Sequence, residues 1–140
     1  MIDSLKEDRS SRQRSKYIPD VYLYNWTINN LPDSKNFFIT DVDMILRNRK
    51  GSLMLLEIKK RGATVPPHQR TTLKIIDQLI KAGLRQSKGK VSFDSWELPI
   101  SYKGLHLLQF KNTTFEDGLV FFDNKQVTES QLIEILAMRD

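Results

Sequence analysis

Two carboxylates and a lysine are the residues of this sequence whose types and spacing could do chemistry. Asp43 precedes an apolar segment, and Glu57 and Lys59 follow the apolar run 53–56 with one residue between them. Carboxylate oxygens are the ligands that Mg²⁺ prefers, and a bound cation lowers the pKa of its water and offsets charge on a phosphate. If the two acids lie together, these residues suit metal-dependent hydrolysis of a phosphodiester.

The segments that carry these residues predict a β-hairpin. Residues 36–47 and 52–59 are rich in aromatic, β-branched and aliphatic residues and are separated by Asn48-Arg49-Lys50-Gly51. A three-residue loop that ends in glycine is a common hairpin connection, and it would place Asn48 opposite Ser52. Paired residue numbers then sum to 100 along the whole hairpin.

In this register Asp43 faces Glu57 and Asp41 faces Lys59, with all four side chains on one face. Asp41 either joins the acidic cluster or forms an ion pair with Lys59. A Glu-x-Lys pattern is common on strands, so the group could also be a solvated sheet edge. Against this, Glu57 follows four apolar residues in what reads as an interior strand, where an ionised carboxylate needs a partner or a metal.

On these residues the sequence resembles the PD-(D/E)XK nuclease superfamily, and within it small Holliday-junction-resolvase-like and phage-encoded nucleases. The similarity covers about residues 19–110. It implies that Asp43, Glu57 and the backbone carbonyl of Ile58 hold Mg²⁺ or Mn²⁺, and that Lys59 orients or deprotonates the attacking water.

Further site residues follow from the resemblance. Such nucleases often carry a glutamine at the start of the next helix, and Gln69 stands there as a catalytic candidate or as an ordinary polar residue. An upstream helical acid would be Glu7 or Asp20. His68 either touches a phosphate near the helix N-terminus or faces solvent. We expect His106, between two leucines, to be a satisfied sheet residue.

The positive charge is concentrated in the middle of the chain. The sequence holds 22 Lys and Arg against 17 Asp and Glu, for a net charge of +5. Residues 47–90 carry twelve basic and two acidic residues, whereas residues 91–140 carry four and eight. Such a segment fits a polyphosphate partner, although a solvated helix face would look the same. The residues predicted to bind DNA are Lys60, Arg61, Arg70 and Lys74.

The remaining pattern predicts an α/β protein, with residues 1–16 as a mobile basic arm and 17–140 as a single domain. Residues 19–30 read as a helix, or as a strand because their aromatic residues alternate. A further helix is expected over residues 67–83, with Gly83 near its C-cap. Strands are expected at 91–96, 105–110 and 118–122, the last followed by a turn at Asp123-Asn124. A capping box at 128–131 opens a final helix, whose inward residues are Leu132, Ile133, Ile135 and Leu136.

We therefore expect a central mixed β-sheet flanked by helices, followed by a C-terminal hairpin and helix. The resemblance implies a restriction-endonuclease-like αβββαβ core, whose first strand falls at about residues 36–40. The expected function is a metal-dependent endonuclease acting on branched or structured DNA. The alternatives are a non-catalytic nucleic-acid-binding module on the same fold and an interaction protein with an incidental acidic hairpin.

The composition limits the chemistry and the cellular compartment that we expect for this protein. The chain has no cysteine, which excludes disulfides, cysteine-bound metals and a thiol nucleophile. Its longest apolar runs are far too short to span a membrane. We expect a cytoplasmic protein, in the host cytoplasm if it is phage-encoded, with DNA as its partner and a homodimer left open.

Overall fold

The computed structural model describes residues 19–31, 40, 42–60 and 62–139. The chain divides into two units, Met1–Ile39 and Thr40–Asp140, which we describe separately. In the first unit, α2 runs over Pro19–Asn30, which confirms the helix rather than the strand. The expected end of the basic arm at residue 16 lies outside the described residues and stays a prediction.

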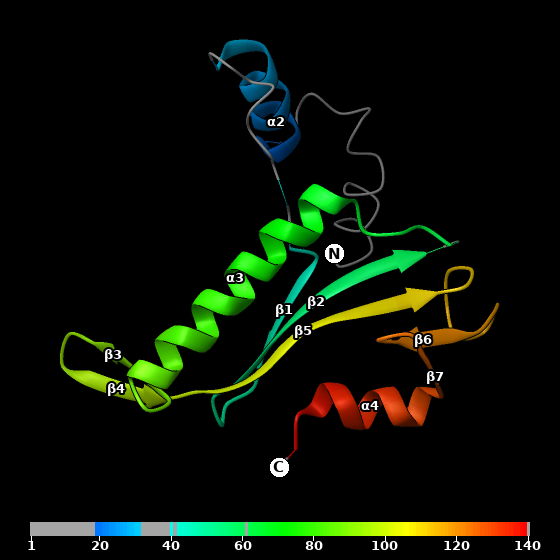
Figure 1. Cartoon of the computed structure of the whole chain (residues 1–140). Helices are drawn as coiled ribbons and strands as arrows, with labels where there is room; N and C mark the ends of the chain where they lie inside the picture. The colour runs from blue at the N-terminus through cyan, green and yellow to red at the C-terminus, as the bar shows by residue number, and fades with distance from the viewer. Residues whose placement is uncertain (1–18, 32–39, 41, 61, 140) are drawn as a thin grey trace. The chain divides into compact units, whose positions relative to one another are not determined.

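The second unit contains a five-stranded mixed sheet (Figure 1). Its strand order is β1-β2-β5-β6-β7, in which β2 and β5 are parallel and the other neighbours are antiparallel. The strands are β1 (Met44–Arg47), β2 (Ser52–Lys60), β5 (Ser101–Phe110), β6 (Val120–Phe122) and β7 (Lys125–Val127). The predicted α/β class, with a mixed sheet flanked by helices, is confirmed.

The β1–β2 hairpin has the predicted register, since Met44 pairs with Leu56 and Arg47 with Leu53. The strand is shorter than the expected residues 36–47, since β1 begins at Met44. Asp43, just before it, bonds to β2 through its side chain, which accepts from the N–H of Ile58. Residues 36–39 lie outside the described part of the chain.

The hairpin turn depends on Gly51. Its φ of 91° is in the left-handed region, and a Cβ there would collide with the carbonyl oxygen of Pro99. The turn is closed by a 3.1 Å hydrogen bond from the N–H of Asn48 to the carbonyl of Ser52. Glycine at this position therefore serves both the turn and its packing.

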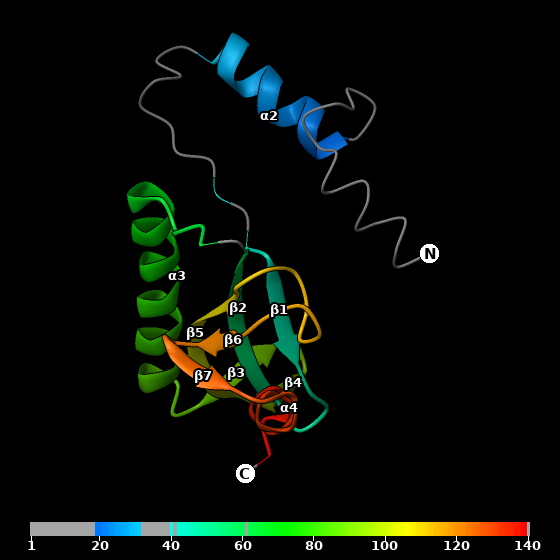
Figure 2. The same ribbon diagram turned by 90° about the vertical axis from the view of Figure 1, so that its right-hand side faces the viewer.

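The helix after the hairpin, α3 (Pro67–Gln86), packs on one face of the sheet (Figure 2). It begins at the proline pair and continues three residues past the predicted end, so the expectation that Gly83 lies near the C-cap is wrong. The positive φ angles that follow the helix belong to Lys88 and Gly89 instead. The N–H of Gly89 donates to the carbonyl of Leu84 at 2.8 Å.

A small two-stranded sheet connects α3 to β5. It consists of β3 (Lys90–Phe93) and β4 (Trp96–Pro99), so the single strand expected over residues 91–96 is wrong. A turn at residues 94–95 interrupts it. The rings of Phe93 and Trp96 stack across this turn at 4.4 Å, which holds the two short strands together.

The opposite face of the sheet carries the main apolar core, in which Leu56, Leu108, Val120 and Leu132 are buried together. Leu132 comes from α4 (Glu129–Ala137), which opens with the predicted capping box. Ile133 is 55% exposed, so its predicted inward orientation is wrong. Ile133 follows Leu132 in the helix and therefore points in a different direction from Leu132, which faces the core.

The parallel pair of β2 and β5 contains a register shift. Leu53 pairs with Tyr102 and Leu55 with Leu105, so β5 holds one extra residue at a bulge that includes Gly104, with φ 95°. Because side chains alternate along a strand, the extra residue leaves both Tyr102 and Leu105 on the face that α3 covers.

The described chain leaves the restriction-endonuclease-like core untested. Its first strand, expected at about residues 36–40, lies outside the described residues except for Thr40, which is not in a strand. Within the described ranges, no helix is both long enough and apolar enough to cross a membrane.

Candidate active site

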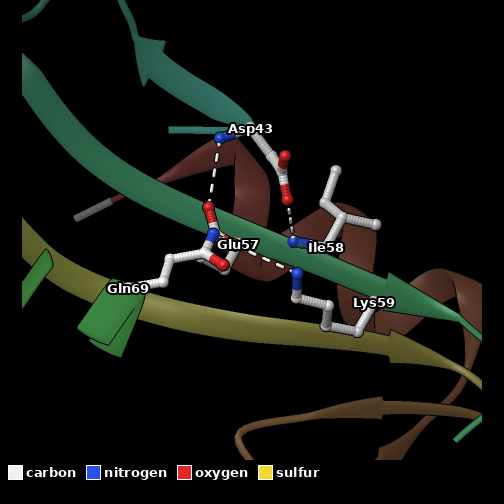
Figure 3. A network of polar contacts seen from close by, with 5 residues as sticks. All are labelled: Asp43, Glu57, Ile58, Lys59 and Gln69. Carbon is white, nitrogen blue, oxygen red and sulfur yellow. Dashed lines mark hydrogen bonds and ion pairs between the residues drawn. The ribbon is translucent and has the colours of Figure 1, made fainter. Parts of the chain in front are cut away.

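Asp43 and Glu57 are locked to each other where β1 meets β2 (Figure 3). The N–H of Asp43 donates to Oε1 of Glu57 at 3.2 Å, and Oδ2 of Asp43 accepts from the N–H of Ile58 at 2.8 Å. The side chain of Asp43 thus binds the backbone of the next strand, which fixes both carboxylates. The predicted approach of the two acids is confirmed.

Glu57 is a buried acid. It is 2% exposed and follows the apolar residues of the interior strand β2, as the sequence predicted. The pKa of its carboxyl is raised to about 7, first by burial and next by the negative charge of Asp43. The N–H of Asp43 and the ammonium of Lys59 act in the opposite direction. A second positive charge at this carboxylate would relieve both of the unfavourable contributions.

Lys59 and Gln69 contact the same oxygen of Glu57. The Lys59 Nζ lies 3.8 Å from Glu57 Oε2, and Gln69 Nε2 donates to that oxygen at 2.7 Å. Gln69 reaches it from the first turn of α3, which the proline pair places beside the end of β2. The structure thus brings Gln69, which the sequence left open as a catalytic candidate or an ordinary polar residue, together with the acidic pair and the lysine, and its role in catalysis stays a prediction.

The donor set matches what Mg²⁺ takes from proteins, namely one or two carboxylates with the remaining positions left to water and substrate oxygens. The raised pKa of the paired carboxyl is the observation of this structure that favours a cation here. Among the described residues, no group of three or more His, Cys, Asp or Glu side chains is arranged to hold a metal. Asp43, Glu57 and the Ile58 carbonyl would be the protein ligands.

Several predicted site residues lie outside the described part of the chain. These are Asp41, Glu7 and Arg61, together with the side chain of Asp20. Their assignments as further metal ligand, upstream acid or DNA contact remain predictions.

The other predicted DNA-binding residues, Lys60, Arg70 and Lys74, are all exposed. Lys60 ends β2, while Arg70 and Lys74 are one helical turn apart at the beginning of α3, next to Gln69. His68 is exposed in the same first turn, and its contact with a phosphate stays a prediction.

His106 is satisfied within the sheet, as predicted. Its Nδ1 lies 2.6 Å from Asp123 Oδ2 and its Nε2 lies 2.5 Å from the carbonyl of Lys103. This histidine therefore holds the β6–β7 turn against β5.

Sequence reasoning missed a second buried acid. Asp77, on α3, is 7% exposed, accepts from the hydroxyl of Tyr102 at 2.7 Å and pairs with Lys81 at 2.8 Å. The four-residue spacing of Asp77 and Lys81 is a visible signal for the pair. Nothing in the sequence shows that Tyr102, 25 residues away, completes it.

Comparisons with known proteins add no relative. No protein-family model matches the chain, and neither a curated protein nor a solved structure shows significant similarity to it. The resemblance to PD-(D/E)XK nucleases therefore depends on the residues described above.

Proposed function

We propose that this protein is a metal-dependent nuclease of the PD-(D/E)XK type that hydrolyses phosphodiester bonds in branched or otherwise structured DNA. The observation that carries the proposal is the Glu57 carboxylate, 2% exposed and held against a second carboxylate, with a lysine ammonium 3.8 Å away. An ion pair that serves stability alone does not place a second, half-buried carboxylate against a buried one, since like charges oppose each other.

In this proposal Asp43, Glu57 and the Ile58 carbonyl would hold Mg²⁺ or Mn²⁺, and the bound cation would supply a water of lowered pKa and neutralise charge on the phosphate. Lys59 sits on the same face and stabilises the negative charge that develops as the water attacks. Gln69 is a positioning residue, because its amide donates to Glu57 and thereby fixes the direction of the carboxylate. The positive end of α3 lies in the same turn and favours an anion.

The DNA-binding part of the proposal is supported by the exposed cations next to the site. Lys60, Arg70 and Lys74 would contact successive phosphates without reading sequence. Substituting Arg70 and Lys74 together by alanine should reduce the slope of log affinity against log salt by about 2. An unchanged slope would mean that these residues form only a solvated face.

The decisive experiment is a panel of single-stranded, duplex, nicked, flap and four-way DNA substrates incubated with Mg²⁺ or Mn²⁺. The wild-type protein should cleave at least one of them, and Lys59→Ala should not. Lys125→Ala, which changes an exposed lysine on β7, is the matched control and should cleave normally.

The same panel separates the alternatives. Salt-dependent binding without cleavage would indicate a non-catalytic nucleic-acid-binding module on this fold. Failure to bind any substrate at low salt would indicate an interaction protein and would overturn the proposal.

A further inference from the structure

A hollow of about 370 Å³ opens beside Lys59, within the size range of small-molecule pockets. Its lining includes two lysines, two residues with side-chain amides and two phenylalanines, of which Phe110 packs against the core on the other face of the sheet. These are Lys59, Lys111, Gln109, Asn124, Phe110 and Phe121. The hollow shares Lys59 with the candidate active site, so an occupant would lie next to a phosphate bound at Glu57.

The sheet places these groups in a row. Lys59 pairs with Gln109 on β5, and Gln109 pairs with Phe121 on β6. Directly paired residues project from the same face, so an ammonium, an amide and an aromatic ring follow one another across three strands. Neighbouring strands are about 4.8 Å apart, so the backbones of Lys59 and Phe121 are about two such spacings apart.

The far wall of the hollow is held in place before any ligand arrives. Asp123 makes two hydrogen bonds to the backbone of Leu107: its side-chain Oδ1 accepts from the Leu107 N–H at 2.9 Å, and its own N–H donates to the Leu107 carbonyl at 2.8 Å. The His106 ring pairs with the same carboxylate. These contacts fix the turn that carries Asn124, next to the strand β6 that carries Phe121.

The lining matches one kind of occupant. An aromatic ring stacks on any nucleobase, amides bond to base edges, and lysines bind phosphates. A base inside a duplex is paired and stacked on both sides, so it can enter such a hollow only after leaving the helix.

We propose that this hollow binds the base of an unpaired nucleotide adjacent to the phosphate held at Glu57 and Lys59. The inference rests on the proposed nuclease function and sharpens it: the preferred substrate is a single-stranded segment or a frayed strand, such as a branch point supplies. Phe121 and Lys111 are the specificity-determining residues, Phe121 for the base and Lys111 for the following phosphate.

Binding of labelled DNA in EDTA, where no cleavage occurs, tests this assignment. Phe121→Leu keeps an apolar side chain but removes the ring, and it should weaken binding to a single strand about 5- to 100-fold while changing duplex affinity less than about twofold. Phe93→Leu, a ring on the separate β3–β4 hairpin, is the matched control and should leave both affinities unchanged. Lys111→Ala should reduce the salt slope for a single strand by about 1.

A set of single strands, each lacking the base at one position, provides an independent readout. The wild-type protein should bind one of these strands more weakly than the intact one, and Phe121→Leu should lose that difference. Equal losses for single strand and duplex, or a missing-base effect that persists in Phe121→Leu, would overturn the inference. So would a free nucleoside monophosphate that competes as well as the oligonucleotide, since the hollow would then serve a free nucleotide.

The inference and the proposed function can fail separately. Metal-dependent cleavage with no dependence on Phe121 would remove the base-binding hollow and leave the nuclease. Phe121-dependent binding of single strands without cleavage on any substrate would leave the hollow and remove the nuclease.

Discussion

Glu57 and Asp77 are the two acidic residues that are buried in the described part of the chain, and their surroundings differ in kind. Asp77 is desolvated, which raises its pKa, but hydrogen bonds from Lys81 and Tyr102 outweigh that effect and the pKa lies below the usual value. Glu57 is also desolvated, but one of its charged neighbours is another acid, Asp43, and its pKa rises to about 7.

The difference shows why burial alone does not identify a functional acid. Asp77 has a phenol at 2.7 Å and an ammonium at 2.8 Å, so its charge is stabilised by the protein itself. Glu57 has an ammonium only at 3.8 Å and shares its site with Asp43, so the protein leaves part of its charge uncompensated. The charge of Asp77 is thus compensated within the fold, whereas that of Glu57 is compensated only in part, and the proposed metal site depends on this difference.

The largest expected effect is on cleavage. Glu57→Gln and Asp43→Asn should each reduce metal-dependent cleavage at least about 100-fold, because each removes an anionic ligand at the reacting phosphate. Asp77→Asn should cleave at the wild-type rate per folded molecule. Initial rates on the best substrate of the panel, corrected for the folded fraction by circular dichroism, measure this contrast. If Glu57→Gln cleaves like the wild type, the two acids do not differ in function.

The next effect is on the pH dependence of stability without metal. Folded Glu57 keeps its proton up to about pH 7, whereas unfolded Glu57 loses it near 4.5, so the folded state binds more protons between these values. The free energy of unfolding should therefore fall as pH rises through this window, by on the order of 3 kcal/mol. Urea unfolding at several pH values measures it. Glu57→Gln should lack this slope, and a slope that remains would have to come from another group.

Asp77 should act in the opposite direction. Its folded pKa is lowered from 3.8, so the stability that it contributes is present above that value and is lost as pH falls through the lower folded pKa. At pH 7, Asp77→Asn should reduce the free energy of unfolding by about 2 kcal/mol, because hydrogen bonds to a charged group are weakened. Lys81 is 44% exposed, so solvent screens its share. Urea unfolding of Tyr102→Phe should show a smaller loss of the free energy of unfolding. If Asp77→Asn does not change the free energy of unfolding, Asp77 has no structural role.

The smallest effect is stabilisation by metal. A ligand that binds only the folded state at ten times its dissociation constant adds about 1.4 kcal/mol to the free energy of unfolding. Millimolar Mg²⁺ or Mn²⁺ should raise the melting temperature of the wild type and of Asp77→Asn alike, and should leave Glu57→Gln unchanged. Differential scanning fluorimetry measures this, with Ca²⁺ as a further cation. Equal shifts in all three proteins would place the metal away from Glu57.

The two acids also differ in how well their surroundings can be predicted from the sequence. The approach of Asp43 to Glu57 was predictable because a three-residue loop ending in Gly51 sets the register of the two adjacent strands. The capping box of α4 was predictable for the same reason, since all of its contacts are local.

The surroundings of Asp77 and the hollow beside Lys59 were not predictable in this way. Tyr102 reaches Asp77 only because a one-residue bulge in β5 changes which side chains face α3, and no local pattern reports the bulge. Phe121 meets the row that starts at Lys59 through two strand pairings between segments distant in sequence. The end of α3 was missed because glycine favours a cap at position 83, whereas the helix continues through it to Gln86 and is capped at Ser87, followed by Lys88 and Gly89 with positive φ.

The parallel pairing of β2 with β5 has a consequence for the order in which the molecule folds. The β1–β2 hairpin is local and can form within about 1–10 μs, but β5 is separated from β2 by the whole of α3 and the β3–β4 hairpin. Closing such a long loop comes late and slows folding. Glu57 pairs with Leu107 on β5, so its burial is complete only when this pairing has formed. Removing this carboxylate from water is unfavourable, so it adds to the free-energy cost of that late step.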